Sequence, residues 1–319
     1  MKKSASELAT GGELVAHMDG EEMVWLLGQP HLTDYLAFVR EKVIGGEHMS
    51  QRLLADEWRK ANDLYYELEQ SEAGFADGAE CLPLPKEMRG LARALKRDRY
   101  FTETFDTLPT EIRMVELAKL IVSQSNVSCE FSEALRKRLR EARDPESLFR
   151  FCLPVERDLP PVTVRKSGKD RYVFTSPSTD FRLHNPAVLA AADVGGLKPF
   201  GPVASVFALP VGFGSNFLSV VASDDRLLLQ NGYHRSYSLL AAGFTHAPAV
   251  VQLVTRKDEL RIAATDDVNN DPAFYFRAAR PPVLKDFLDP RFGRKLLAKR
   301  MQTTIEIEWK VRSSTGSLV

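Results

Sequence analysis

The amino-acid sequence predicts an α+β fold in which an all-helical N-terminal region precedes a mixed-sheet core. Apolar residues between positions 1 and 110 recur at helical spacing, whereas strand-length apolar runs separated by glycine, proline and turn residues dominate after position 111. A chain of 319 residues is long enough for two modest domains. We therefore expect a helical region over 1–110 and a second domain over 111–319, with an insertion around 150–200.

The N-terminal helices are predicted from the spacing of apolar side chains. In the segment 31–40, Leu32, Tyr35, Leu36 and Val39 follow the i, i+3, i+4, i+7 pattern of a one-faced helix. The segment 50–70 has the same pattern, and a further helix is expected to start at Lys86 and to run into the aromatic residues 100–105. Nothing in these segments indicates catalysis, so their aromatic side chains are interpreted as core. The region is also a candidate surface for a protein partner.

The second domain is predicted to contain a small mixed sheet. Two of its strands flank the loop 212–216, which contains two glycines, and are expected to form a hairpin. Helical pieces are expected around 283–288 and 294–301, followed by a last strand over 304–311. The five sheet strands are expected at Val115–Val122, Val203–Val211, Phe217–Ala222, Arg226–Gln230 and Ala247–Val254.

Composition argues against several functions. Lys plus Arg equals Asp plus Glu, at 43 each, and a protein that binds DNA non-specifically usually carries basic excess. The basic segment 291–300 is interpreted as the solvated face of a helix rather than as a nucleic-acid patch. The three cysteines stand singly and the six histidines are scattered, which indicates reduced thiols and no metal site. Without a membrane-length apolar run or an apolar leader, we expect a cytoplasmic protein with no membrane partner.

One segment carries a chemical signal. The apolar strand 227–230 runs into Asn231 and Gly232, and a helix is predicted to begin at once. The first turn of a helix exposes unpaired amides and partial positive charge. We expect Gly232 either to adopt a backbone conformation poorly accessible to other residues or to approach a ligand too closely for a Cβ. Arg235 adds a planar guanidinium suited to phosphate, and His234 adds a donor that titrates near neutral pH. Together these features predict a phosphate-binding site at the end of the strand.

This segment resembles the ParB/sulfiredoxin superfamily, whose signature is a strand, Gly-x-x-Arg or Asp-Gly-His-His-Arg, a helix, and Gly-x-x-x-x-Pro before a buried strand. Five residues are in register with that signature: Gly232, His234, Arg235, Gly243 and Pro248. The strand 115–122 followed by Gln124 is similar to the family's first strand and the glutamine after it.

The resemblance implies a ParB/sulfiredoxin-like core that binds a nucleoside triphosphate (ATP or CTP), with or without magnesium. It implies a phosphotransferase or a nucleotide hydrolase. His234 would neutralise developing charge, and Glu116 is our own candidate for the base or a magnesium ligand, so both are taken as catalytic candidates. A non-catalytic regulatory or DNA-associated protein switched by nucleotide is the alternative, and nuclease activity is disfavoured. The implied nucleotide-binding residues are Asn231, Gly232, Tyr233, His234, Arg235 and Ser236.

Three departures from the family pattern limit what can be carried over. Tyr233 stands where sulfiredoxins have their catalytic cysteine, so sulfinic-acid reduction is not expected. Ser236 stands where partition proteins have a second arginine, and Asn231 replaces a common acidic residue. No helix-turn-helix follows the core, which argues against a role in chromosome partition.

A purely structural interpretation of the same residues stays open. Gly232 would then only end a strand, Arg235 would pair with Asp224 or Asp225, and His234 would be a turn histidine. His246 is interpreted as a loop residue. The insertion also carries four cations that form either a basic lid over the pocket or a solvated loop: Arg165, Lys166, Lys169 and Arg171.

Overall fold

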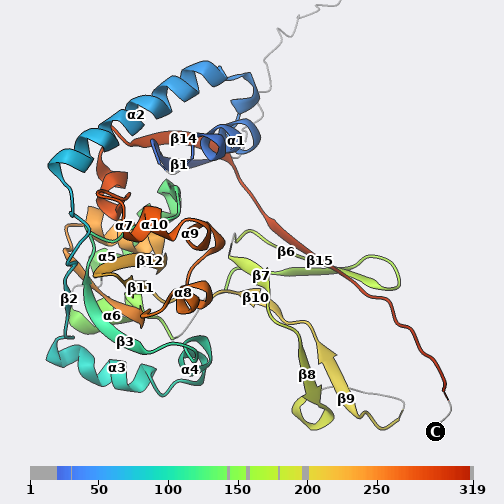
Figure 1. The fold of residues 1–319 in the computed structure, drawn as a ribbon. Helices are drawn as coiled ribbons and strands as arrows, with labels where there is room; N and C mark the ends of the chain where they lie inside the picture. Colours follow the sequence, from blue (N-terminus) through green and yellow to red (C-terminus); the bar gives the residue numbers. More distant parts are fainter. Residues whose placement is uncertain are drawn as a thin grey trace, which may run out of the picture.

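The structure is a computed structural model that describes residues 20–29, 31–141, 144–155, 159–178, 180–195 and 201–316. These residues form a body of helices and two sheets, from which a β-rich arm extends (Figure 1). The mixture of helices with mainly antiparallel strands confirms the α+β class. The ParB/sulfiredoxin-like core stays a prediction.

The central sheet of the body has five strands in the order β12-β11-β13-β3-β2. Only the neighbours β11 and β13 run parallel. Beyond β12, Ile121 forms a parallel bridge with Leu228, so the segment before Gln124 lies beside β12. The strands are β2 (Cys81–Leu82), β3 (Thr110–Glu116), β11 (Ser219–Ser223), β12 (Arg226–Asn231) and β13 (His246–Leu253).

The second sheet of the body joins the two ends of the described chain. Strand β1 (Gly20–Leu26) lies between β14 (Gly293–Lys299) and β4 (Asn126–Ser128), antiparallel to both. The N-terminal region is therefore not all-helical, and the helix expected over 294–301 is wrong. Leu296 and Ala298 are buried, whereas Lys295, Leu297 and Lys299 are exposed, which is the alternation of a strand. Pairing with β1 overrides the helix-forming composition.

The basic segment 291–300, expected as the solvated face of a helix, contains strand β14 instead. Its cations pair with carboxylates: Arg291 with Asp289, Arg294 with Glu57, Lys295 with Glu22 and Arg300 with Glu130.

Helices surround the sheets and begin at side-chain caps where the sequence provides them. Ser50 accepts a hydrogen bond from the amide of Leu53, and Asp98 and Asp144 cap in the same way. The predicted helix 86–105 is divided into one 3-10 and two α-helices. The α-helices are α1 (Leu32–Lys42), α2 (Gln51–Ser71), α3 (Arg89–Leu95), α4 (Arg99–Thr104), α5 (Cys129–Glu141), α6 (Pro145–Cys152), α7 (Tyr233–Ala241), α8 (Lys257–Ala263), α9 (Asp266–Asn270) and α10 (Pro272–Phe276). The 3-10 helices are η1 (Gly46–His48), η2 (Lys86–Met88), η3 (Ala191–Asp193) and η4 (Leu284–Leu288).

The arm contains three small antiparallel sheets with the strand orders β15-β6-β5, β10-β7 and β8-β9. It extends away from the body on the side opposite α2 and α3 (Figure 1). Four of its strands come from the predicted insertion 150–200, two follow directly after it, and one comes from the C-terminal part of the chain. Its strands are β5 (Thr163–Lys166), β6 (Arg171–Ser176), β7 (Phe181–Leu183), β8 (Ala187–Ala190), β9 (Ser205–Ala208), β10 (Val211–Phe213) and β15 (Thr303–Glu308).

Two expectations for the sheet strands are wrong. The stretch Val203–Val211 does not form a hairpin with Phe217–Ala222, because β9 pairs with β8, β10 pairs with β7, and β11 joins the central sheet. Pro210 lies between β9 and β10, where a continuous strand would lose a donor. The predicted strand Val115–Val122 is displaced, since β3 ends at Glu116 and only Ile121 returns to the sheet.

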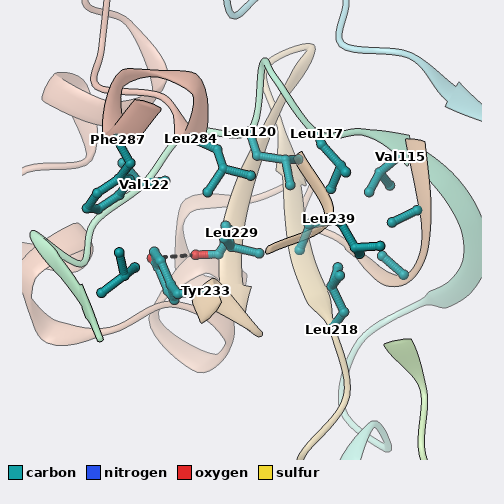
Figure 2. Packing of buried hydrophobic residues seen from close by; sticks show 14 of the residues in the cluster. Val115, Leu117, Leu120, Val122, Leu218, Leu229, Tyr233, Leu239, Leu284 and Phe287 are labelled. Atoms are coloured by element: carbon teal, nitrogen blue, oxygen red, sulfur yellow. Dashed lines mark hydrogen bonds between the residues drawn. The ribbon is translucent and has the colours of Figure 1, made fainter. Parts of the chain in front are cut away.

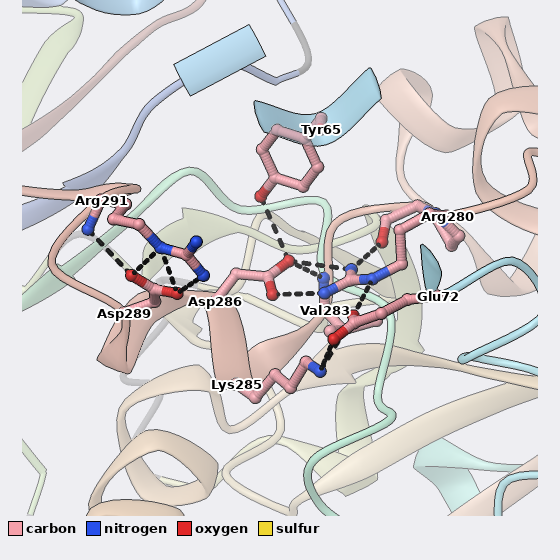
Figure 3. Close-up of polar contacts among 9 residues, drawn as sticks. Tyr65, Glu72, Arg280, Val283, Lys285, Asp286, Asp289 and Arg291 are labelled. Carbon is pink, nitrogen blue, oxygen red and sulfur yellow. Dashed lines mark hydrogen bonds and ion pairs between the residues drawn. The ribbon is translucent and has the colours of Figure 1, made fainter. Parts of the chain in front are cut away.

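One apolar cluster connects both sheets of the body with the helices. It includes Val24 of β1, Tyr65 of α2, Val115 of β3 and Leu239 of α7. Figure 2 shows this packing beside β12 and α7. A buried polar network adds to it, because Arg280, Asp286, Tyr65 and Glu72 connect α2 to η4 (Figure 3).

Candidate phosphate-binding site at the start of helix α7

The turn from β12 into α7 has the glycine geometry that the sequence predicts. Gly232 has φ 92° and ψ 26°, in the left-handed region that other residues rarely adopt. A Cβ at this position would lie 3.1 Å from Cα of Leu218. The prediction that Gly232 takes a conformation poorly accessible to other residues is therefore confirmed. The close neighbour is the chain's own backbone, at the entry to β11.

Tyr233 connects this turn to the segment that carries Gln124. Its buried hydroxyl donates to the carbonyl of Leu229 at 2.7 Å (Figure 2) and accepts from the amides of Ser123 at 3.1 Å and Gln124 at 3.3 Å. Burial raises the pKa of the phenol, so it stays protonated. The structure thus brings together the two family-like segments, and Tyr233 connects them rather than pointing at a ligand.

His234 is held in a structural contact. Its Nε2 accepts a hydrogen bond from the amide of Ser128 at 2.9 Å, and its ring forms a T-shaped pair with Phe131, with centroids 5.1 Å apart. Burial, with a smaller effect of the neighbouring Arg235 cation, lowers the pKa of His234 to about 4. At neutral pH the imidazole is therefore uncharged, and the nitrogen that would take up a proton is already bonded.

Asn231, Arg235 and Ser236 fix the surroundings of the first turn. Arg235 donates from Nη1 and Nη2 to the main-chain and side-chain oxygens of Asn216. Asn231 donates to the carbonyl of Ser215 and accepts from the amide of Gly232 at 2.7 Å. Ser236 bonds the carbonyl of Gly232 through both its amide, at 2.8 Å, and its hydroxyl, at 3.0 Å. The loop 214–216 is thus attached to the helix start, and β10 of the arm ends directly before this loop.

The structure does not bring Glu116 to this site. Glu116 ends β3 opposite His246, pairs with Lys119 at 3.3 Å and accepts from the amide of Glu80 at 3.1 Å. The neighbouring amide of Leu117 bonds the carbonyl of Thr245, which follows the C-terminal end of α7. Gly232 lies at the opposite end of this nine-residue helix, which is roughly 14 Å long.

The other carboxylates and the second histidine considered from sequence lie elsewhere. Asp224 and Asp225 form the turn between β11 and β12, with φ of 50° and 62°, at the end of β12 opposite Gly232. His246 lies at the start of β13, with Nε2 2.9 Å from Glu80. The candidate basic lid is placed on β5, β6 and their connection, which extend away from α7 (Figure 1).

Three amides at the start of α7 have no acceptor within the helix. The first helical bond runs from the amide of Ser236 to Gly232, so the amides of Tyr233, His234 and Arg235 precede the i→i−4 ladder. Sequence analysis missed Ser123, Ser128 and Asn216, which bond these residues from elsewhere in the chain, Ser123 and Asn216 from loops and Ser128 from the end of β4. No motif marks them, although Asn216 belongs to the predicted glycine-containing loop.

Comparison with known proteins adds no further assignment. No protein-family model matches the chain, and neither do any curated proteins or solved structures. Among the described residues, no cluster of three or more His, Cys, Asp or Glu side chains is arranged to hold a metal ion. Within the same ranges, every helix is too short or too polar to cross a membrane.

Proposed function

We propose that this protein is a nucleotide-responsive binding protein. A phosphate group, such as that of ATP or CTP, binds at the first turn of α7, and the arm presents the surface for a partner. The observation that carries this proposal is the double hydrogen bond from Arg235 to Asn216 at the base of the arm. The same guanidinium that would meet a phosphate holds the loop that leads out of β10.

The coupling follows from competition for the guanidinium. The two Asn216 oxygens are neutral acceptors, and a charged phosphate is a stronger partner for arginine than a neutral amide. A bound phosphate would therefore draw Arg235 toward the amides of α7 and release the loop 214–216. A ligand shifts a conformational equilibrium only through such a difference in contacts between two states.

The surroundings of the site support binding over catalysis. His234 is neutral near pH 7 and its Nε2 is bonded to Ser128, so it is poorly placed to move a proton. Glu116 lies by the other end of α7, paired with Lys119. Neither His234 nor Glu116 therefore supplies a general base beside the first turn of α7. The phosphotransferase or hydrolase activity implied by the resemblance stays a prediction.

A thermal-shift panel tests the proposal. ATP, CTP, GTP, ADP and AMP are each added with and without magnesium, and a ligand present at 100 times its Kd raises the unfolding free energy by about 2.7 kcal/mol. We expect a shift for wild type, no shift for Arg235→Ala, and a partial shift for Arg235→Lys, since lysine cannot reproduce the planar fork. Arg99→Ala, at an exposed arginine on α4, is the matched control and keeps the full shift.

Two results contradict the proposal. One is the absence of a shift with every nucleotide. The other is an unchanged shift in Arg235→Ala with a native far-ultraviolet circular dichroism spectrum. Release of phosphate from ATP or CTP in the same samples would instead support the enzyme hypothesis.

A further inference from the structure

The sheet β15-β6-β5 of the arm ends in a short strand with a free edge. β5 pairs with β6 on one side, and no other strand of the described residues pairs with its opposite side. All four of its residues, Thr163 to Lys166, are exposed. An edge strand with exposed amides and carbonyls can receive another extended segment.

An apolar groove lies beside this edge. Its volume is about 360 Å³, and its walls come from the segment before β5, from β5 and β6, and from β10. Val164 is 58% exposed and Leu159 is 61% exposed, which are high values for apolar side chains in and beside a three-stranded sheet. The lining side chains are Leu159, Val162, Val164, Phe174, Val211 and Phe213.

Side chains alternate along β5. Val164 lies opposite Phe174 in the ladder and shares the groove with it, and Lys166 lies further along the same face, opposite Tyr172. Arg165 lies opposite Val173 on the other face. Lys166 and Lys169 follow Arg165 at the tip of the hairpin. Within the described ranges none of these three cations forms an ion pair, whereas Arg171 already pairs with Glu306 at 3.1 Å.

We propose that β5 accepts an extended segment of a partner protein as a fourth strand of this sheet. Alternate residues of that segment are apolar and enter the groove, and the intervening residues are acidic and face Arg165. This inference deepens the proposed function by giving the partner's chemistry. The ladder hydrogen bonds supply affinity, while the groove and the cations select the sequence.

The charges on the edge also select against a second copy of this chain. Two β5 strands paired edge to edge would bring their arginines and lysines together, and like charges across strands are unfavourable. An acidic strand reverses the sign of that interaction. The same cations that deter self-association therefore favour an acidic partner.

Fluorescence anisotropy of a dye-labelled peptide in which valine and glutamate alternate tests the inference. We expect binding to the full-length protein, and none for a peptide in which valine and lysine alternate. A peptide with the same residues in one valine block and one glutamate block is the matched control, and we expect it to bind at least tenfold more weakly. Methylation of alternate amides, on the side that faces β5, should abolish binding, because it removes the ladder donors.

Two variants of the protein locate the site. In the double variant Arg165→Glu with Lys166→Glu, the preference should reverse in favour of the valine–lysine peptide. Val164→Ser, at an exposed position that does not hold the core, should weaken binding of the valine–glutamate peptide about tenfold, because one valine side chain is lost from the groove. Arg150→Ala on α6 is the surface control and should leave the affinity unchanged.

Four outcomes overturn the inference. The first is equal binding of the alternating and block peptides, and the second is retained preference in the charge-reversed variant. The third is binding of a labelled oligothymidine without binding of either peptide, which indicates a nucleic-acid surface. The fourth is no binding of any probe. All of these measurements are made without nucleotide. If a repeat with ATP or CTP leaves peptide binding unchanged, that result would contradict only the proposed nucleotide response.

Discussion

The guanidinium of Arg280 donates two hydrogen bonds to the carboxylate of Asp286, at 2.7 and 3.1 Å, and both side chains are almost fully buried. Tyr65 of α2 donates to the same carboxylate at 3.1 Å, and Glu72 accepts from Arg280 at 2.9 Å (Figure 3). This network ties the N-terminal helix α2 to η4 near the other end of the chain.

Removing the buried carboxylate should be costly. Asp286→Asn leaves the Arg280 cation buried with only Glu72 opposite, and breaking one side of a buried ion pair costs about 3–5 kcal/mol. Urea denaturation measures the loss. Glu306→Gln, which breaks the exposed pair with Arg171, is the control and should cost less than about 1 kcal/mol. Equal losses in the two variants would mean that Asp286 contributes no more than a surface carboxylate.

Three glycine substitutions separate backbone strain from crowding. Gly232→Ala combines a left-handed φ with a Cβ 3.1 Å from Leu218 and should cost about 2–4 kcal/mol in unfolding free energy. Gly243→Ala has a similar φ of 88° but open space, so it should cost only about 1–2 kcal/mol. Gly90→Ala in α3 should be neutral or slightly stabilising. An equal cost at Gly232 and Gly243 would show that the contact with Leu218 relaxes freely.

Stability should fall in mild acid because of His234. Its pKa is lowered to about 4 in the folded protein, from an ordinary value of 6.5, so the unfolded chain takes up a proton first as pH decreases. The contribution of the neutral imidazole to the unfolding free energy is complete above pH 6.5. It is lost as pH falls toward 4, and the loss is at most about 3 kcal/mol. Urea denaturation of His234→Gln between pH 7 and 4 should show a flatter profile than wild type. His48→Gln, at an exposed histidine, should keep the wild-type slope, and a wild-type slope in His234→Gln would refute the assignment.

The three cysteines should differ widely in reactivity. Cys81 is exposed, and partial burial of its thiol also raises its pKa, whereas burial raises the pKa of Cys129 to about 11 and that of Cys152 to about 12. Ellman's reagent at pH 8 should therefore label one thiol rapidly in the native protein and the other two only slowly or after denaturation. Cys81→Ser should remove the rapid phase, and a rapid phase that persists would mean that α5 or α6 opens readily.

The parts of the fold that sequence predicts well are local. β12, Gly232, α7 and β13 follow one another directly, and an apolar run, a left-handed glycine and a helix with Gly243 after it are all visible within one window. The pairing of β1 with β14 is not visible in this way, because each strand is recognised only beside its distant partner.

In the candidate site, too, the local features are predicted from sequence and the long-range contacts are not. The positions of Gly232 and of the first turn of α7 are predicted by the local motif. The hydrogen bonds between His234 and Ser128 of β4 and between Arg235 and the loop residue Asn216 depend on other parts of the chain. Sequence therefore indicated where an anion would be attracted, but not that both side chains already have partners.

The pairing of Gly20 with Lys299 also affects how the protein is made. A ribosome adding about 5–20 residues per second needs on the order of tens of seconds to reach β14 after it has completed β1. During that time β1, with Val24, Trp25 and Leu26, lacks the neighbour that covers it in the folded protein. Such a nascent chain is expected to depend on chaperones until its last strands emerge, and truncation before β14 should yield an aggregating product rather than a smaller folded one.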